Sequence, residues 1–324
     1  MDKIIDVKKI IKDKKENLKK RVENIKIEEE TITKVAVVVL NDDEKTKIFV
    51  EKKAELCEEI GIEQETHFLN NDVTQEEVEV LIEKLNKDDS IYGIILQLPA
   101  YKGLDIEETI LAIDPEKDVE GLHPYNLGKL VSNTSSIKPC TPKGILTILE
   151  SQGVEIEGKN VTIVGRSLLV GKPLAHILMQ KNATVTVCHT KTKDLGSMTR
   201  TADILVVATG IPNLITEEMV KEGAIVIDVG INKLENGKVV GDVELDSVLK
   251  RCGMITPVPG GVGLTTVLSL VENIVEITEN KLGIKYIEYA VKEDKESKKS
   301  KIRAIPSRLK GYFKNKKIKN IKEN

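Results

Sequence analysis

A glycine-rich turn between two strand-like runs carries the clearest chemical signal in this sequence. Val161 to Val164 is a short β-branched run with a glycine on each side, which is typical of a buried strand. Gly165, Arg166 and Ser167 follow, and an apolar helical segment begins at Gly171-Lys172-Pro173. Free N–H groups at the start of a helix bind phosphate, and glycine lets a phosphate approach them closely. The pattern therefore predicts half of a nucleotide-binding fold.

The spacing of this turn departs from the common dinucleotide fingerprint, and a plain strand-to-helix turn is the alternative. The fingerprint places glycines at relative positions 0, 2 and 5, whereas Gly165, Ser167 and Gly171 stand at 0, 2 and 6. The next strand leads into His189-Thr190-Lys191-Thr192-Lys193, with hydroxyls and cations where an NAD site carries Asp or Glu. Together with Arg166, this segment suits a 2′-phosphate. It predicts NADP as the cofactor, with a solvated basic loop as the alternative.

Length and composition indicate a globular protein of two domains plus extra segments. The chain has 324 residues, of which 40% are hydrophobic and 3% aromatic, so its cores should be aliphatic. It shows no long apolar run, and its charged N-terminus does not resemble a signal peptide, so we expect no membrane span and a cytoplasmic location. Four cysteines are far apart and predict neither a metal site nor a disulfide framework: Cys57, Cys140, Cys188 and Cys252.

Charge is distributed unevenly along the chain. Residues 291–324 hold 13 Lys and Arg against 4 Asp and Glu, a net charge of +9. Because the whole chain has a net charge of −3, residues 1–290 carry −12. We expect the tail to be mostly disordered and dispensable for catalysis, because its apolar residues are sparse and not periodic. Contact of the basic tail with anionic partners is the alternative role.

The first half of the sequence alternates strand and helix signals. Apolar residues recur at helical spacing over the first 25 or so residues. Thr74 and Glu77 form a capping box before a further amphipathic helix. This β-α-β-α-β order predicts an α/β domain with a parallel sheet. The remaining expected elements are strands at Val35–Leu40, Glu65–Leu69 and Ile91–Leu98, and a helix at Thr46–Ile60 that Gly61 ends.

A long segment rich in Pro, Gly and Asn, "DPEKDVEGLHPYNLGKL", predicts irregular structure. A helix at Lys143–Gln152 should then lead into the nucleotide-binding domain. That domain continues through strands at Ile204–Ala208 and Ala224–Asp228, each followed by glycine, which places loops at the carboxyl edge of the sheet where α/β proteins bind ligands. After Pro259-Gly260-Gly261, a final helix is expected from Thr266 to about Asn280.

Taken in order, these segments resemble one known family. The motifs "YGIILQLP", "PEKDVEGLHPYN", "PCTPKG", "IVGRSLLVGKP", "TVTVCHTKT", "DILVVATG", "IVIDVGIN", "GDV" and "TPVPGGVG" look like those of the bifunctional methylenetetrahydrofolate dehydrogenase/methenyltetrahydrofolate cyclohydrolases, the FolD family. The resemblance covers residues 1 to about 283 and does not reach the tail.

The resemblance implies a two-domain α/β subunit with a cleft between the domains and homodimerisation through the nucleotide-binding domains. Residues 1–145 would be the folate-binding catalytic domain, residues 146–263 a Rossmann-like NADP-binding domain, helix 264–283 would pack back on the first domain, and residues 284–324 would be the tail. The implied reactions are oxidation of 5,10-methylenetetrahydrofolate with NADP and hydrolysis of the methenyl product to 10-formyltetrahydrofolate.

For the folate site, the resemblance implies four residues. Phe49 stands where the family has Tyr, and Lys53 keeps the family's catalytic lysine one helical turn later. Gln97 matches the glutamine that hydrogen-bonds this lysine, and Glu120 replaces an aspartate that grips the pterin. Lys53, Gln97 and Glu120 are the implied catalytic residues. On residue type alone, Lys53 would be an ordinary exposed helix lysine and Gln97 a strand-end side chain that bonds the backbone.

Two further sets of residues follow from the resemblance. The loop containing Gly260 and Gly261 would lie beside folate and nicotinamide, although Leu264 replaces a proline that would stiffen it. The implied NADP contacts are Gly165, Arg166, Ser167, Thr190 and Ile231. Two alternatives stay open: a dehydrogenase without cyclohydrolase activity, which Phe49 and Glu120 would favour, and a non-catalytic nucleotide-binding protein.

Overall fold

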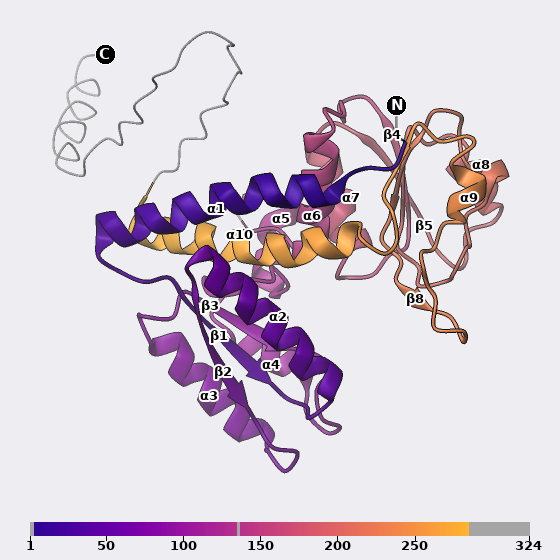
Figure 1. The fold of residues 1–324 in the computed structure, drawn as a ribbon. Helices are drawn as coiled ribbons and strands as arrows, with labels where there is room; N and C mark the ends of the chain where they lie inside the picture. The colour runs from indigo at the N-terminus through magenta and orange to yellow at the C-terminus, as the bar shows by residue number, and fades with distance from the viewer. Residues whose placement is uncertain (1–2, 135–136, 285–324) are drawn as a thin grey trace, which may run out of the picture. The chain divides into compact units, whose positions relative to one another are not determined.

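The structure is a computed structural model that describes residues 3–134 and 137–284, and it is built around two parallel sheets with helices packed against them (Figure 1). This architecture confirms the predicted α/β class. The basic tail, for which we expect disorder, lies outside the described residues from residue 285 onward. Within the described ranges, no helix combines the length and apolarity that crossing a membrane requires.

The first sheet has three parallel strands in the order β2-β1-β3. The central strand β1 is buried on both sides, as its Val-rich sequence predicts. The predicted capping box is confirmed, since the Thr74 hydroxyl and the Glu77 carboxylate each accept a backbone N–H at the start of α3. The elements are β1 (Lys34–Val39), α2 (Glu44–Ile60), β2 (Glu63–Phe68), α3 (Gln75–Lys87) and β3 (Gly93–Gln97).

The second sheet has five parallel strands in the order β10-β7-β6-β4-β5, and a short antiparallel hairpin, β8-β9, stands beside it. After β4, the chain adds β5 on one side of that strand and then places β6 on its other side. The point between β4 and β6, where the strand order changes direction, is where open α/β sheets bind ligands. The elements are β4 (Asn160–Val164), α7 (Gly171–Gln180), β5 (Thr184–Cys188), α8 (Leu195–Thr199), β6 (Ile204–Val207), η1 (Glu217–Met219), β7 (Ile225–Asp228), β8 (Asn232–Lys233), β9 (Val239–Val240), α9 (Leu245–Val248) and β10 (Met254–Ile255).

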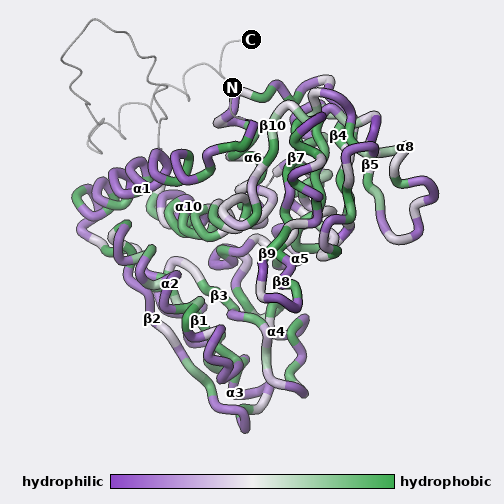
Figure 2. Tube along the Cα trace, turned by 45° about the vertical axis from the view of Figure 1, so that its right-hand side comes forward, coloured by the Kyte–Doolittle hydropathy of each residue, from purple (hydrophilic) through white to green (hydrophobic). Residues whose placement is uncertain are grey.

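Three long helices complete the fold: α1 (Val7–Glu29), α6 (Cys140–Ser151) and α10 (Val262–Leu282). α1 and α10 lie side by side (Figure 1), and α10 is much more hydrophobic than α1 (Figure 2). Leu268, Val271 and Ile274 of α10 belong to the core cluster that also contains Val35 and Val37 of β1. A buried ion pair joins α1 to α10, with Arg21 Nη2 2.6 Å from Glu279 Oε2.

The structure differs from the sequence expectations in three places. α1 begins only at Val7, because Ile4 forms a parallel bridge with Ile255 of β10 and Asp6 caps the helix. The segment expected to be irregular contains α5 (Pro124–Val131), and α4 (Ile106–Ala112) precedes it. α10 starts four residues before the expected Thr266, so Leu264 lies in its first turn.

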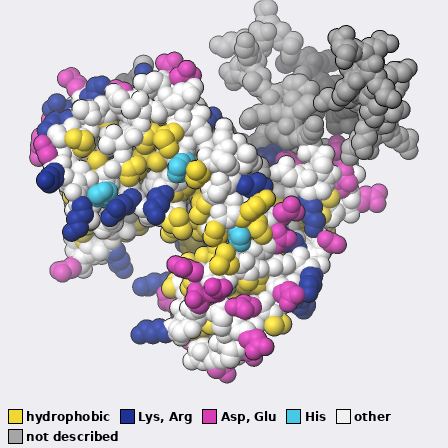
Figure 3. Space-filling view, turned by 180° about the vertical axis from the view of Figure 1, so that it is seen from behind, with side chains coloured by type: hydrophobic (Ala, Val, Ile, Leu, Met, Phe, Trp, Pro, Cys, Tyr) yellow, Lys and Arg dark blue, Asp and Glu magenta, His cyan; other side chains and the backbone are white. Residues whose placement is uncertain are grey.

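The surface mixes charged and apolar side chains. On the face seen in Figure 3, hydrophobic side chains gather in places between Lys, Arg, Asp and Glu side chains. Among the large apolar residues that are about half exposed are Leu168 and Leu169, directly after the glycine-rich turn, and Met179 of α7.

Candidate functional site

A buried lysine and the end of a strand form the centre of the candidate folate site. Lys53 lies on α2 with only 8% of its surface exposed, and its Nζ donates a 2.8 Å hydrogen bond to Oε1 of Gln97, the last residue of β3. Gln97 Nε2 donates to the Leu98 carbonyl at 2.8 Å, so the amide oxygen faces the lysine. Phe49, one turn earlier on α2, places its ring centroid 5.0 Å from the same Nζ and leaves the ring half-exposed.

Glu120 approaches this lysine from a loop that Asp118 holds in shape. Asp118 is buried, and its carboxylate accepts from the backbone N–H groups of Gly121 (3.0 Å) and His123 (2.8 Å). The Asn126 side chain donates a third bond at 3.0 Å. A buried carboxylate with three donors is well satisfied, so Asp118 is a structural anchor for its neighbour Glu120. No sequence signal had singled out Asp118 for this task.

Burial acts on both ionisable groups of the pair. It lowers the pKa of Lys53 below its ordinary value, and the nearby Glu120 carboxylate opposes part of that shift. Burial also raises the pKa of Glu120 to about 7, against the attraction of Lys53. Their mutual attraction therefore offsets only part of the desolvation, so the pKa of Lys53 stays below its ordinary value while Glu120 can exchange a proton near neutral pH. An exposed surface lysine would not have this property.

The glycine-rich turn of the second sheet is shaped by contacts between backbone segments. Gly165 has a φ of +129°, and a Cβ added there would stand 2.2 Å from the Ala208 carbonyl oxygen at the end of β6. A Cβ on Gly171 would stand 2.1 Å from the Gly165 carbonyl oxygen. Both glycines are thus required by packing. With glycines at these two positions the turn is tight, and α7 packs directly on β4.

The remaining predicted cofactor residues surround this turn. Arg166, Ser167 and Thr190 are all exposed. Ile231, in the loop after β7, is 67% exposed. The nearest acid after β5 is Asp194, whose carboxylate caps α8 by accepting from the Ser197 N–H at 3.0 Å. The segment between β5 and Asp194 therefore offers hydroxyls and cations, as the sequence indicated.

Two buried carboxylates that the sequence analysis did not single out organise the loops at this edge of the sheet. Asp228 ends β7 and accepts from the N–H groups of Gly230, Asp242 and Val243; burial raises its pKa to about 6. Asp242 accepts from Thr209 and Gly210 after β6 and from the Asn232 amide. The "GDV" motif, which contains Asp242, is therefore hydrogen-bonded to the loop after β6, to Asn232 and to the end of β7. In the sequence, only the presence of Asp242 in that motif could have indicated this role.

The loop before α10 is also tight. Gly260 is half-buried with a φ of +98°, and a Cβ on Gly261 would stand 2.3 Å from the Pro257 carbonyl oxygen. Thr266, in the first turns of α10, donates to the Thr141 hydroxyl of α6 at 3.2 Å. The structure thus brings Phe49, Lys53, Gln97 and Glu120 together, while the glycines of this loop belong to the segment between β10 and α10.

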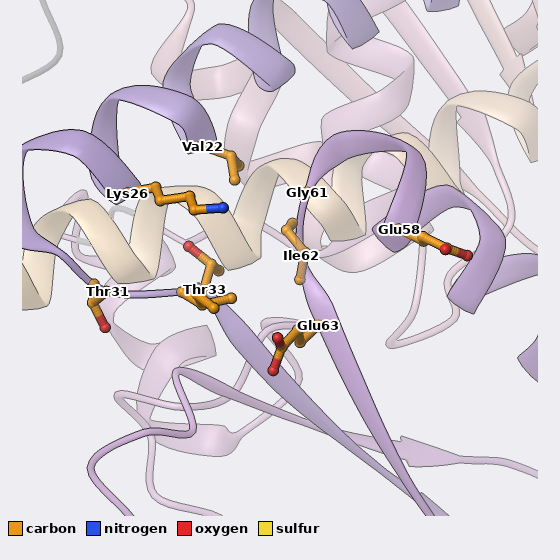
Figure 4. Close-up of a pocket in the computed structure, with 9 residues that line it drawn as sticks. Val22, Lys26, Thr31, Thr33, Glu58, Gly61, Ile62 and Glu63 are labelled. Carbon is orange, nitrogen blue, oxygen red and sulfur yellow. The ribbon is translucent and has the colours of Figure 1, made fainter.

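Away from this site, the described residues contain a separate cavity but no group of potential metal ligands. Across the described ranges, no three His, Cys, Asp or Glu side chains are grouped so that they could hold a metal ion. A cavity of about 200 Å³ lies between α1, α2 and the starts of β1 and β2 (Figure 4). Lys26, Glu58 and the buried Thr33 line it, and the Thr33 hydroxyl has no hydrogen-bond partner among the described residues. None of the candidate site residues lines this cavity.

Comparison with known proteins identifies matches over almost all of the described chain. Residues 5–120 match the family model "Tetrahydrofolate dehydrogenase/cyclohydrolase, catalytic domain", and residues 139–282 match "Tetrahydrofolate dehydrogenase/cyclohydrolase, NAD(P)-binding domain". The "Bifunctional protein FolD" of Methanosarcina barkeri is 47% identical over 276 residues, which are 85% of this chain and 96% of that protein.

Two solved structures share the fold. The bifunctional enzyme FolD, methylenetetrahydrofolate dehydrogenase/cyclohydrolase, of Campylobacter jejuni has a TM-score of 0.84 and 43% identity, over 86% of this chain and 99% of that one. The methylenetetrahydrofolate dehydrogenase-cyclohydrolase of Trypanosoma brucei, solved with NADP and an inhibitor, has a TM-score of 0.80 and 33% identity, over 86% and 98%.

Proposed function

Because this chain belongs to the tetrahydrofolate dehydrogenase/cyclohydrolase family, we propose that it oxidises 5,10-methylenetetrahydrofolate with NADP and then hydrolyses the methenyl product to 10-formyltetrahydrofolate. The observation that carries the proposal is the buried hydrogen bond between Lys53 and Gln97, with Glu120 facing the same ammonium group. This arrangement supplies proton handling, which the hydrolytic reaction requires.

The residues of the glycine-rich turn fit NADP. Gly165 and Gly171 let the turn close tightly on the protein's own backbone, and the start of α7 beside it offers N–H groups to a phosphate. Arg166 and Thr190 would bind the 2′-phosphate, because both can donate hydrogen bonds and no free acid follows β5. When bound, NADP accepts the hydride, so the chain's own contribution to this step is to position the two reactants.

In the hydrolytic step, Lys53 acts on the attacking water. Its neutral form can accept a proton, and burial brings that form closer to neutral pH. Gln97 orients the amine through a neutral acceptor, so it does not fix the lysine as a permanent cation, as a carboxylate partner would. Glu120 would bind the pterin, and its negative charge favours the protonated form of Lys53. A half-exposed Phe49 ring gives the substrate a flat apolar surface.

A dehydrogenase that lacks cyclohydrolase activity is the second candidate. Phe49 and Glu120 favour it, because the first lacks the hydroxyl of the family's tyrosine and the second extends the carboxylate by one methylene. Neither change removes Lys53 or Gln97, which are the groups that handle the proton. We therefore retain both activities in the proposal.

The proposal includes assembly and location. Leu168 and Leu169 in the glycine-rich turn and Met179 near the end of α7 are each about half-exposed, which supports a homodimer formed through the second sheet's half of the chain. The four cysteines are free, which suits a reducing cytoplasm. The basic residues 291–324 would contact anionic partners. Light scattering coupled to gel filtration tests the dimer, and a monomer at micromolar concentration would refute it.

The decisive experiment measures both activities on the purified protein, with NADP and NAD in parallel. Reduction of NADP, followed by absorbance, should depend on 5,10-methylenetetrahydrofolate and exceed reduction of NAD. Added 5,10-methenyltetrahydrofolate should disappear faster than it does in buffer. NADP reduction with accumulation of the methenyl compound would select the second candidate, and failure of both reactions would refute the proposal.

A further inference from the structure

We infer that Asn273 of α10 positions Glu120 opposite Lys53, and that the hydrolytic activity depends on it. This inference rests on the proposed function. Asn273 is completely buried, and its Nδ2 donates to the carbonyl oxygens of Val119 at 2.8 Å and Lys138 at 2.9 Å. Val119 is the residue directly before Glu120, so the first bond fixes the peptide from which the Glu120 side chain extends.

The orientation of the Asn273 amide is set by a charge. Lys143 Nζ donates to Asn273 Oδ1 at 2.9 Å and lies 2.8 Å from the Glu276 carboxylate. With its oxygen bound to a cation, the amide must direct both N–H groups toward the two carbonyls. Asn273 thereby connects three segments of the chain: the Glu120 loop, the residues before α6, and α6 itself. A buried amide with every donor satisfied locks the local geometry.

Glu120 depends on this support because of what surrounds it. Among the described residues its carboxylate has no hydrogen-bond partner of its own, so its position follows from the backbone on either side. Asp118 holds one side through Gly121, and Asn273 holds the other through Val119. Loss of the Asn273 bonds would let the loop shift and carry the carboxylate away from Lys53. A misplacement of about 1 Å can cost about 100-fold in rate.

The test compares Asn273→Ala and the similarly branched Asn273→Leu with Thr278→Val. Thr278 is a suitable control because it is also buried on α10 but bonds only to the Ile274 carbonyl of its own helix. At saturating folate substrate, where weaker binding of the pterin by Glu120 does not limit either rate, we expect both Asn273 variants to lose about 100-fold in methenyl hydrolysis, with the kcat of NADP reduction and the KM for NADP close to wild type. Thr278→Val should preserve the ratio of the two activities. Asn273→Leu keeps the branched shape and leaves no cavity, so it serves if Asn273→Ala does not fold.

A second readout does not require activity. Three groups act on the charge of Lys53: Glu120, Cys140 and Cys57. Glu120 favours the charged lysine, so its displacement must move the titration of Lys53 to lower pH. The pH dependence of Lys53 acetylation by acetic anhydride, measured by mass spectrometry, follows this titration directly. Asn273 Nδ2 also lies 3.7 Å from Cys140 Sγ, but burial raises the pKa of the Cys140 and Cys57 thiols, so both stay uncharged while Lys53 titrates.

The two readouts separate this inference from the proposed function. If the wild type lacks cyclohydrolase activity, the proposed function fails in that part, while the Lys53 titration still tests the role of Asn273. The inference is overturned if Lys53 titrates alike in wild type and both Asn273 variants. It is also overturned if the two activities fall by the same factor in the Asn273 variants, because that outcome indicates general damage to the fold.

Discussion

The two halves of the candidate active site are organised by different means. Around Lys53, buried side chains hold one another: Gln97 accepts from the lysine, and Glu120 is held through Asp118 and its neighbours. Around Gly165, the backbone itself makes the close contacts, and side chains such as Thr190 stay exposed. The first half is preorganised before substrate arrives, whereas the second is a rigid turn with adaptable side chains around it.

The half around Lys53 would therefore carry the reaction chemistry, and the half around Gly165 would carry cofactor recognition. In the first half, a side-chain replacement should change a reaction and leave the fold largely intact, since the backbone anchors lie elsewhere. In the second half, replacing a glycine should damage the turn, while replacing an exposed side chain should alter only the choice of cofactor. Each variant below tests one side of this comparison, and the expected effects decrease from one to the next.

Removal of the Lys53 amine should have the largest effect. Lys53→Met should reduce methenyl hydrolysis by about 100- to 10,000-fold, the range typical of a lost general acid or base, while NADP reduction stays measurable. In the wild type, hydrolysis should rise with pH as Lys53 loses its proton, with a midpoint below the ordinary 10.5 because burial lowers the pKa of Lys53. Lys52→Met, at the exposed neighbouring position, is the matched control. Equal hydrolysis by both variants would remove Lys53 from the mechanism.

Addition of a methyl group to the glycine-rich turn should be the next most damaging change. Gly171→Ala places a Cβ 2.1 Å from the Gly165 carbonyl oxygen, so the turn must shift. Such overpacking costs about 1–3 kcal/mol, and we expect both a lower melting temperature and weaker NADP binding by calorimetry. Gly128→Ala in α5 is the control, because the space around that glycine is open. Unchanged NADP affinity in Gly171→Ala would show that cofactor binding does not depend on this turn.

Cofactor choice should depend on Arg166. A charged hydrogen bond to phosphate contributes about 1.5–3 kcal/mol, so Arg166→Ala should lower the preference for NADP over NAD by at least about tenfold. Ratios of kcat/KM for the two cofactors measure this preference. Because Arg166 belongs to the glycine-rich turn, melting curves should accompany the kinetics. An equal loss with both cofactors would assign Arg166 to the turn or the pyrophosphate.

Restoring the family's tyrosine should give a modest gain. Phe49→Tyr adds a hydroxyl to a half-exposed ring near Lys53. One hydrogen bond contributes about 0.5–1.5 kcal/mol, or about 2- to 13-fold, and we expect hydrolysis to increase within that range. Phe68→Tyr, on β2 and similarly exposed, should change nothing. A decrease in hydrolysis by Phe49→Tyr would show that the site has adapted to phenylalanine.

The smallest effect is expected at the tail. Deletion of residues 291–324 should leave both activities near wild type, because the segment is rich in charge and poor in periodic apolar residues. Steady-state assays of the two reactions before and after deletion check this expectation. A large loss of NADP reduction would instead show that the tail contributes to the catalytic body.

The sequence predicted those elements whose signals are local. Alternating apolar runs, the Thr74 capping box and glycines after strands located both sheets and most helices. α5 was not predicted, since Pro124 and Gly128 suggest a loop and the helix is stabilised by the burial of Leu130. The bridge between Ile4 and Ile255 has no local signal at all.

Prediction of the candidate site had a similar limit. The family resemblance, not spacing alone, pointed to Lys53 and Gln97, which lie 44 positions apart in the chain, and their roles remain predictions. Asn273 and Val119 are separated by 154 positions, and a single asparagine in an apolar helix indicates no partner. Supporting residues of this kind become visible only when the chain is folded.

The placement of α10 also constrains how this protein can fold during synthesis. Val35 and Val37 of the first sheet need Leu268, Val271 and Ile274 to complete their core, and these residues leave the ribosome more than two hundred positions later. The first sheet is therefore synthesised early, but its core stays incompletely covered until almost the whole chain has been made. The five-stranded sheet lies between these two segments in sequence and can form during that interval. Contacts this distant in sequence slow folding and prolong the exposure of apolar surface to chaperones.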